Sequence, residues 1–109
     1  MKLTDLDPKF YGMGGEGISN AEGTPVPARK GMGLIFNCPC GKCNEMRRLA
    51  IPFANPLDGG PPYDEKIGRG ALWQRTGDTF ETLTLTPSIL RMEECKWHGF
   101  ITNGEIITV

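Results

Sequence analysis

Hydrophobic and polar residues alternate along much of the second half of this chain, in the pattern of β-strands. Leucine and threonine alternate in Thr82-Leu83-Thr84-Leu85-Thr86, and single residues separate Leu49, Ile51 and Phe53. Because successive side chains of a strand point to opposite faces, each run predicts a strand with one buried face. Proline cannot donate a sheet hydrogen bond, so we expect the later strand to end at Pro87.

The strongest turn signal is Asn103-Gly104, which lies between the apolar pairs Phe100-Ile101 and Ile106-Ile107. Asn and Gly both tolerate the positive φ that a two-residue hairpin requires. Helix signals are weak, and residues 88–94 are expected to form at most one or two turns, with Ser88 as the N-cap. The pattern predicts a small, mainly antiparallel β domain.

Residues 1–30 are rich in Gly, Pro and small polar residues. We expect them to form an extended arm or long loop on a single domain of residues 31–109. Within this arm, Gly12 to Gly17 matches the spacing of the dinucleotide-binding fingerprint. That fingerprint works only between a strand and a helix N-terminus, whose amide groups hold the phosphates. Neither flank fits, so nucleotide binding is not expected.

Composition predicts a thin hydrophobic core, because the 109 residues include 15 Gly and 9 Pro and are only 39% hydrophobic. Small domains of this kind usually need a staple such as a metal ion. Trp73 and Trp97 are expected to pack in this core rather than bind a partner.

The net charge of −1 offers no basic surface for nucleic acid. Residues 1–7 contain no apolar run that could serve as a signal peptide, and no segment is long enough to span a bilayer. We therefore expect a cytoplasmic protein without membrane contact, with its cysteines reduced.

All four cysteines and the only histidine fall in two clusters, residues 38–43 and 95–98. Each cluster contains a pair separated by two residues, a spacing that lets both side chains reach one ion. The predicted ligands of a structural Zn²⁺ are Cys38, Cys40, Cys43, Cys95 and His98. Since a structural zinc site takes four protein ligands, either Cys38 or Cys40 is spare. A filled shell leaves no position for water and argues against catalysis by the metal.

Three kinds of catalysis are alternatives to this structural site. Pro39-Cys40-Gly41-Lys42-Cys43 is half of the signature of zinc deaminases, but residues 1–37 lack the His or Cys of the other half. Thioredoxin-like chemistry requires the Cys pair at a helix N-terminus, which the β pattern disfavours. Catalysis by Ser, His and Asp is not expected, because the one His is assigned to the metal and no nucleophile elbow is present.

Several blocks spread over nearly the whole chain resemble a family of small uncharacterised phage and prophage proteins. These blocks are Leu6–Pro8, Gly14–Gly17, Pro25–Pro27, Phe36–Gly41, Leu83–Ile89 and His98–Gly104. Members of that family are sometimes labelled ammonia monooxygenase, a membrane-embedded copper enzyme. One histidine and no spanning segment cannot build such a site. The resemblance implies phage origin and the cytosol of a bacterial host, and implies no activity.

The function expected from the sequence is that of a non-enzymatic, zinc-stapled module. Its partner would be a macromolecule, a host or phage protein rather than nucleic acid, and its oligomeric state is open. The alternatives are a zinc-dependent hydrolase or deaminase-like enzyme and a small structural component of a virion.

Overall fold

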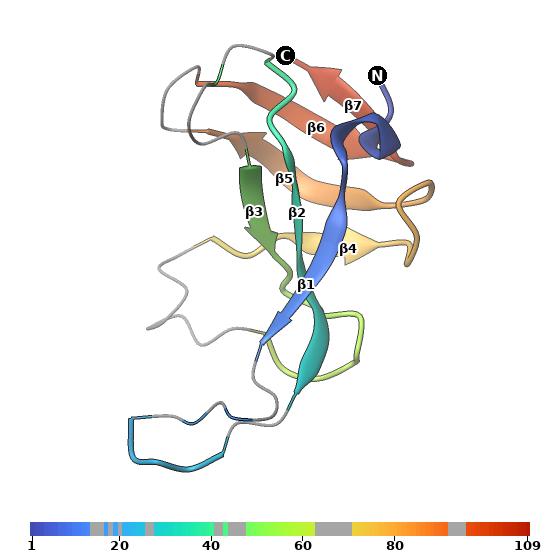
Figure 1. Ribbon diagram of the computed structural model, residues 1–109. Coiled ribbons are helices and arrows are strands. Elements are labelled where there is room, and N and C mark those ends of the chain that lie inside the picture. Colours follow the sequence, from blue (N-terminus) through green and yellow to red (C-terminus); the bar gives the residue numbers. More distant parts are fainter. Residues whose placement is uncertain are drawn as a thin grey trace.

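The fold consists of two antiparallel β-sheets, seen in the computed structural model of Figure 1. The structure describes residues 1–13, 17, 19, 21–25, 28–40, 43, 48–62, 71–91 and 96–109. The three-stranded sheet has the order β1-β2-β3, formed by β1 (Lys9–Met13), β2 (Arg29–Asn37) and β3 (Arg48–Pro52). The four-stranded sheet has the order β4-β5-β6-β7, formed by β4 (Gln74–Thr76), β5 (Thr84–Leu90), β6 (His98–Thr102) and β7 (Glu105–Thr108).

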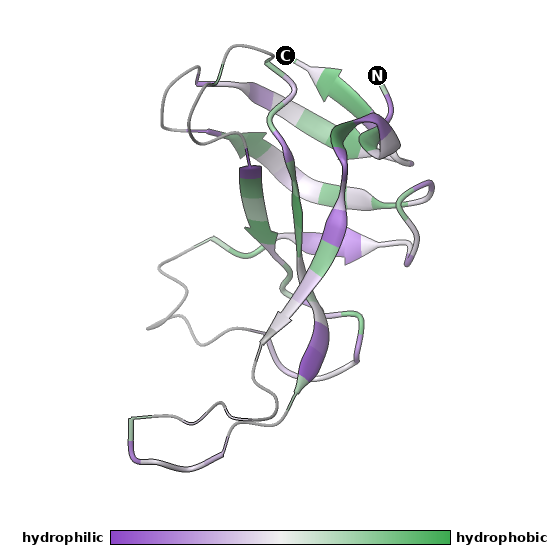
Figure 2. Ribbon diagram, viewed as in Figure 1, coloured by the Kyte–Doolittle hydropathy of each residue, from purple (hydrophilic) through white to green (hydrophobic). Residues whose placement is uncertain are grey.

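One hydrophobic core lies between the inner faces of the two sheets. In β2, Leu34 and Phe36 are fully buried, and in the other sheet Leu85, Ile89 and Ile101 are at most 1% exposed. All of these side chains belong to a single cluster of contacts. Figure 2 shows how hydrophobic residues recur along the strands of both sheets. The prediction of a mainly antiparallel β fold is therefore confirmed, and the described residues contain no α-helix.

The predicted hairpin is present between β6 and β7. Thr102 pairs with Glu105, and the two turn residues have positive φ, 49° at Asn103 and 72° at Gly104. These values match the two-residue turn that suits the twist of antiparallel strands. The hairpin thus has the register that the sequence signal indicated.

The prediction that a strand ends at Pro87 is wrong. β5 continues through Pro87 to Leu90, past a cis peptide bond between Thr86 and Pro87. Leu85 faces Ile101 and Ile89 faces Gly99, so β5 advances four residues where β6 advances two. An irregularity of this kind accommodates a proline, because the ladder hydrogen bond is already absent there. Residues 88–90 belong to the strand, so the expected helical turn does not begin at Ser88, whereas residues 92–94 of that prediction lie outside the described residues.

Residues 1–13 form a short helix and a strand. A 3-10 helix, η1 (Leu3–Leu6), buries Leu3 and Leu6 in the core. β1 then pairs with β2, and the amide of Leu3 donates to the carbonyl oxygen of Gly104 at 2.7 Å. Residues 14–16 of the glycine-rich segment lie outside the described residues, and the division of the chain at residue 30 stays a prediction.

An ion pair fixes the loop after β3 on the start of β2. Arg29 donates to both carboxylate oxygens of Asp58, at 2.8 and 2.9 Å. This hydrogen bonding, with a further one from the amide of Gly60, lowers the pKa of Asp58 to about 2. The described part of the chain contains no helix that is long and apolar enough to cross a membrane.

Two glycines with similar backbone angles provide a test of the hairpin. A Cβ at Gly104 would lie 2.6 Å from the carbonyl oxygen of Phe80 and 2.7 Å from that of Glu81, whereas one at Gly59 would meet nothing within 4 Å. We expect Gly59→Ala to cost about 1–2 kcal/mol through its positive φ alone. Gly104→Ala should cost about 2–4 kcal/mol because the turn must also move away from those carbonyls. Urea unfolding of both variants measures the difference, and equal losses would contradict the close packing of this turn.

Candidate functional site

Three of the predicted metal ligands meet where β2 gives way to the connection towards β3. The sulfur atoms of Cys38 and Cys40 are 3.4 Å apart, and those of Cys40 and Cys43 are 3.3 Å apart. All three Sγ atoms lie within 4.8 Å of one another. These separations exceed the 2.05 Å of a disulfide bond and are close to the roughly 3.8 Å between thiolates that share a tetrahedral zinc. The three cysteines can therefore hold a metal ion.

The cysteine group is built into the hydrophobic core. Cys38 and Cys43 are 8% and 7% exposed and belong to the same buried cluster as Trp97. Cys40 is partly exposed and packs against that cluster. A metal bound here would hold the end of β2 to the start of the connection towards β3.

The other two predicted ligands have different outcomes. Cys95 lies outside the described residues. Among the residues that the structure describes, His98 is not brought into the metal-capable group, which contains only cysteines. Its Nε2 instead lies 3.0 Å from the Oγ of Ser88. A metal-binding role for Cys95 and His98 stays a prediction.

The contact between Ser88 and His98 joins two neighbouring strands. Ser88 lies within the irregular stretch of β5, between Leu85 and Ile89. His98 is the first residue of β6, where it pairs with Leu90. Both side chains are half-buried. The backbone carbonyl of each residue accepts a hydrogen bond from elsewhere in the chain. The indole Nε1 of Trp73 donates to the carbonyl oxygen of Ser88 at 3.3 Å, and the amide of Val109 donates to the carbonyl oxygen of His98 at 2.9 Å.

A serine hydroxyl within hydrogen-bond reach of an imidazole nitrogen is the arrangement of a nucleophile and its general base. With Nε2 unprotonated, His98 accepts the hydrogen of the Ser88 hydroxyl and can take its proton during attack. In the described part of the chain, no carboxylate is hydrogen-bonded to the other ring nitrogen of His98. The pair nevertheless has the hydrogen-bond contact between hydroxyl and imidazole through which a histidine can activate a serine.

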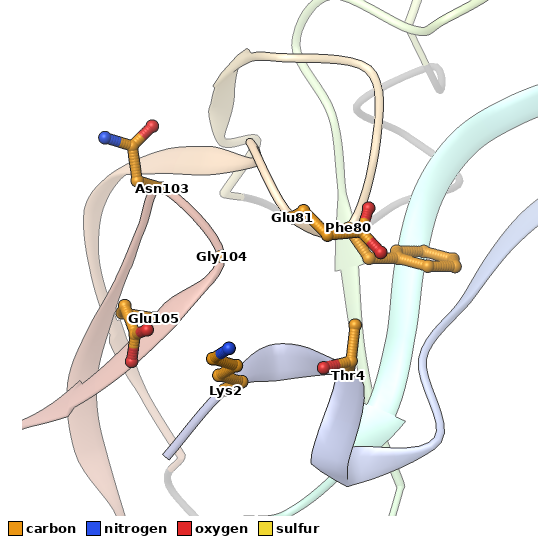
Figure 3. A pocket seen from close by; sticks show the side chains of 7 residues that line it. All are labelled: Lys2, Thr4, Phe80, Glu81, Asn103, Gly104 and Glu105. Atoms are coloured by element: carbon orange, nitrogen blue, oxygen red, sulfur yellow. The ribbon is translucent and has the colours of Figure 1, made fainter.

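A small cavity lies at the other end of β6. It has a volume of about 160 Å³ and is lined by side chains of both charge signs, shown in Figure 3. The lining residues are Lys2, Thr4, Phe80, Glu81, Asn103, Gly104 and Glu105. They surround the hairpin turn after β6, whereas His98 begins that strand. The cavity contains neither the Ser–His pair nor the cysteine group.

Fold and site together define a small two-sheet β protein with a candidate serine nucleophile and a separate cysteine cluster. The family comparison agrees with this class. Residues 18–109 match the family described as "Bacterial ubiquitination-like system serine protease (BubE)", and the chain belongs to this family. No curated protein and no solved structure matches the chain.

Membership of this family overturns the expected function. A non-enzymatic binding module conflicts with a serine protease family, and a zinc deaminase does not fit it either. The broader alternative of a hydrolase agrees in part. The family description does not mention phage or prophage, so that origin stays a prediction from the resemblance.

Ser88 is not among the site residues that the sequence predicts, because the spacing favours a metal role for the one histidine and Ser88 follows a proline in the manner of a helix cap. A simpler signal was present in the composition. The chain contains only two serines, Ser19 and Ser88, and one histidine. A hydrolase that uses a serine and a histidine therefore has two candidate pairs here, Ser19 with His98 and Ser88 with His98. Ser88 is the nearer of the two serines along the chain, ten residues from His98.

Burial predicts the order in which the cysteines react. In protein freed of metal, we expect iodoacetamide to modify Cys40 several-fold faster than Cys38 or Cys43, because only Cys40 is partly exposed. Tandem mass spectrometry of the 38–43 segment after brief labelling measures the three rates. Faster modification of Cys38 or Cys43 would contradict the burial seen here.

Proposed function

We propose that this protein is a serine peptidase of a bacterial ubiquitination-like system, with Ser88 as its nucleophile and His98 as its general base. The observation that carries the proposal is the 3.0 Å contact between Ser88 Oγ and His98 Nε2. The description of the family as serine proteases supports it, because the chain offers only two serines. Ser19, the other serine, is exposed and forms an isolated bridge with Pro25 rather than a contact with His98.

The proposed reaction proceeds through an acyl-enzyme. Ser88 Oγ attacks the carbonyl carbon of the scissile bond while its proton moves to His98 Nε2. The C–N bond then breaks, and the amine leaves with the proton that His98 returns. Water attacks the resulting ester with His98 again acting as base, which releases the carboxylic acid and regenerates the Ser88 hydroxyl.

The local structure supports a fixed geometry for the pair. Ser88 and His98 lie on paired strands of a sheet, and scaffold strands position reacting groups more tightly than free loops do. Irregularities in strands often re-aim a side chain beside an active site. The irregularity between Leu85 and Ile89 fits this role, since it interrupts the regular ladder at the stretch that carries Ser88.

We also propose that the cysteine group holds a structural Zn²⁺. Thiolates are soft ligands that favour zinc in a reducing compartment, and three of them already lie close together in the core. Cys95 would supply the fourth ligand, and His98 would remain with Ser88. Zinc then stabilises the fold, while the peptide chemistry rests on the serine and the histidine.

The nucleophile can be tested without a known substrate. An alkyl fluorophosphonate should form a covalent adduct on Ser88 of the wild-type protein, because it reacts with base-activated serines. We expect Ser88→Ala to abolish the adduct and His98→Ala to slow its formation by about 10³-fold or more. Intact-mass and peptide mass spectrometry measure both. Ser19→Ala is the matched control and should react like the wild type.

Two outcomes would contradict the proposed nucleophile. One is a wild-type protein that forms no adduct at all. The other is a His98→Ala variant that reacts as fast as the wild type, because Ser88 would then not depend on the imidazole.

Metal content gives an independent prediction. Protein purified without chelator should carry one zinc per chain, and Cys43→Ser should lower both the metal content and the stability, by about 2 kcal/mol or more, because metal binding is coupled to folding. Elemental analysis and thermal unfolding measure the two quantities. Ser88→Ala, which leaves the thiols intact, should keep the zinc. Unchanged stability in Cys43→Ser would show that the cysteine group is not a staple.

A further inference from the structure

The outer face of the four-stranded sheet is unusually apolar around Ser88 and His98. The described residues expose five large hydrophobic side chains, of which four lie on or next to β5, β6 and β7. These four, with their exposed fractions, are Leu90 (52%), Phe100 (39%), Ile107 (48%) and Val109 (72%). Exposed apolar side chains that gather in one place mark binding surfaces more often than singly scattered ones do.

Strand pairing shows that these side chains share a face with the histidine. Leu90 pairs with His98, and Phe100 pairs with Ile107. Paired residues of antiparallel strands project from the same face of a sheet. The inner face is formed instead by Ile89 and Ile101, which are at most 1% exposed. The exposed apolar residues are therefore on the side of the sheet that faces away from the core.

The apolar face is continuous with the reacting pair. Leu90 is two residues from Ser88 along β5, a rise of about 7 Å. The ring of Phe100 lies 6.4 Å from the imidazole of His98, measured between centroids. A group bound on this face would thus lie next to the carbonyl that Ser88 attacks.

Near the pair, the described strand residues of this face carry no charge; the exposed Lys96 lies two residues before β6, and residues 92–95 are outside the described residues. The other exposed or half-buried strand residues of the face include Thr84, Thr86 and Thr102, and Thr76 and Gln74 pair with the first two of them. Glu105 is the nearest acidic residue along β6 and β7, and it sits at the far end of the hairpin opposite Thr102. A charged substrate side chain placed over Leu90, Phe100 and Ile107 would lose water without gaining a partner from these three residues.

We propose that this face, formed by Leu90, Phe100 and Ile107, selects a substrate chain with a large apolar side chain next to the scissile bond. The inference rests on the proposed function and adds the substrate class. An extended segment of a protein substrate would lie across the outer face of β5 and β6. Its apolar side chain would cover Leu90 and Phe100, and its carbonyl carbon would stand at Ser88 Oγ. Substrates with a large apolar side chain next to the attacked bond would bury that side chain on this face and react faster than substrates with a charged side chain there.

Peptidyl phosphonate esters test this directly, because each carries one side chain at the position whose carbonyl is attacked and modifies the serine covalently. We would measure the rate at which four such esters, with Leu, Phe, Asp and Lys side chains, modify Ser88. The wild type should react at least about 10-fold faster with the Leu and Phe esters than with the charged ones. Phe100→Ser and Leu90→Ser should each reduce that ratio towards one. Thr102→Ala, on the same face but beyond Phe100, should keep it.

The possible results separate this inference from the function on which it rests. If the alkyl fluorophosphonate modifies Ser88 but the four esters react at equal rates, the apolar selection is wrong and the nucleophile is right. If no reagent modifies Ser88, the proposed function itself fails. Light scattering over a range of concentrations completes the test: a dimer that dissociates in Phe100→Ser would show that a second copy of the chain, not a substrate, occupies this face.

Discussion

Antiparallel pairing between β5 and β6 connects the core, the candidate active site and the apolar outer face. On the inner side, Ile89 and Ile101 complete the core against β2. On the outer side the same pairing sets His98 opposite Leu90 and within 3.0 Å of Ser88. Because side chains alternate between faces, a shift of one residue in this register would exchange the two sides. Core packing therefore holds Ser88 and His98 in contact, although neither side chain is fully buried.

Trp97 shows how closely the core, the cysteine group and the site are joined. It is 5% exposed, shares the buried cluster with Cys38 and Cys43, and directly precedes His98. Its indole Nε1 also donates to Thr108 Oγ1 at 3.0 Å, which ties the start of β6 to the end of β7. The prediction that this tryptophan packs in the core is confirmed. Trp97 therefore joins the first residue of β6 to the buried cluster that contains Cys38 and Cys43.

The cysteines and the histidine illustrate how far spacing can be trusted. Cys38, Cys40 and Cys43 come together as their sequence separation indicated, because a short turn brings close neighbours onto one point. His98 has the same spacing from Cys95, yet it lies beside a serine. Spacing of two residues describes what a side chain is able to reach, and in this structure the strand that contains His98 places its ring beside Ser88.

By itself, the sequence determined the class of fold, the β6–β7 hairpin and the close group of three cysteines. Each of these follows from residues near one another in the chain: alternation selects strands, Asn103-Gly104 selects the turn, and short spacing selects the thiol group. Only the tertiary structure decided that β5 passes through Pro87 and that Ser88 meets His98. That contact depends on an irregular register between two strands, with four residues on one opposite two on the other. This register depends on which side chains of the two sheets pack together in the core. Those side chains are far apart in the sequence, so no local pattern of residues encodes the register.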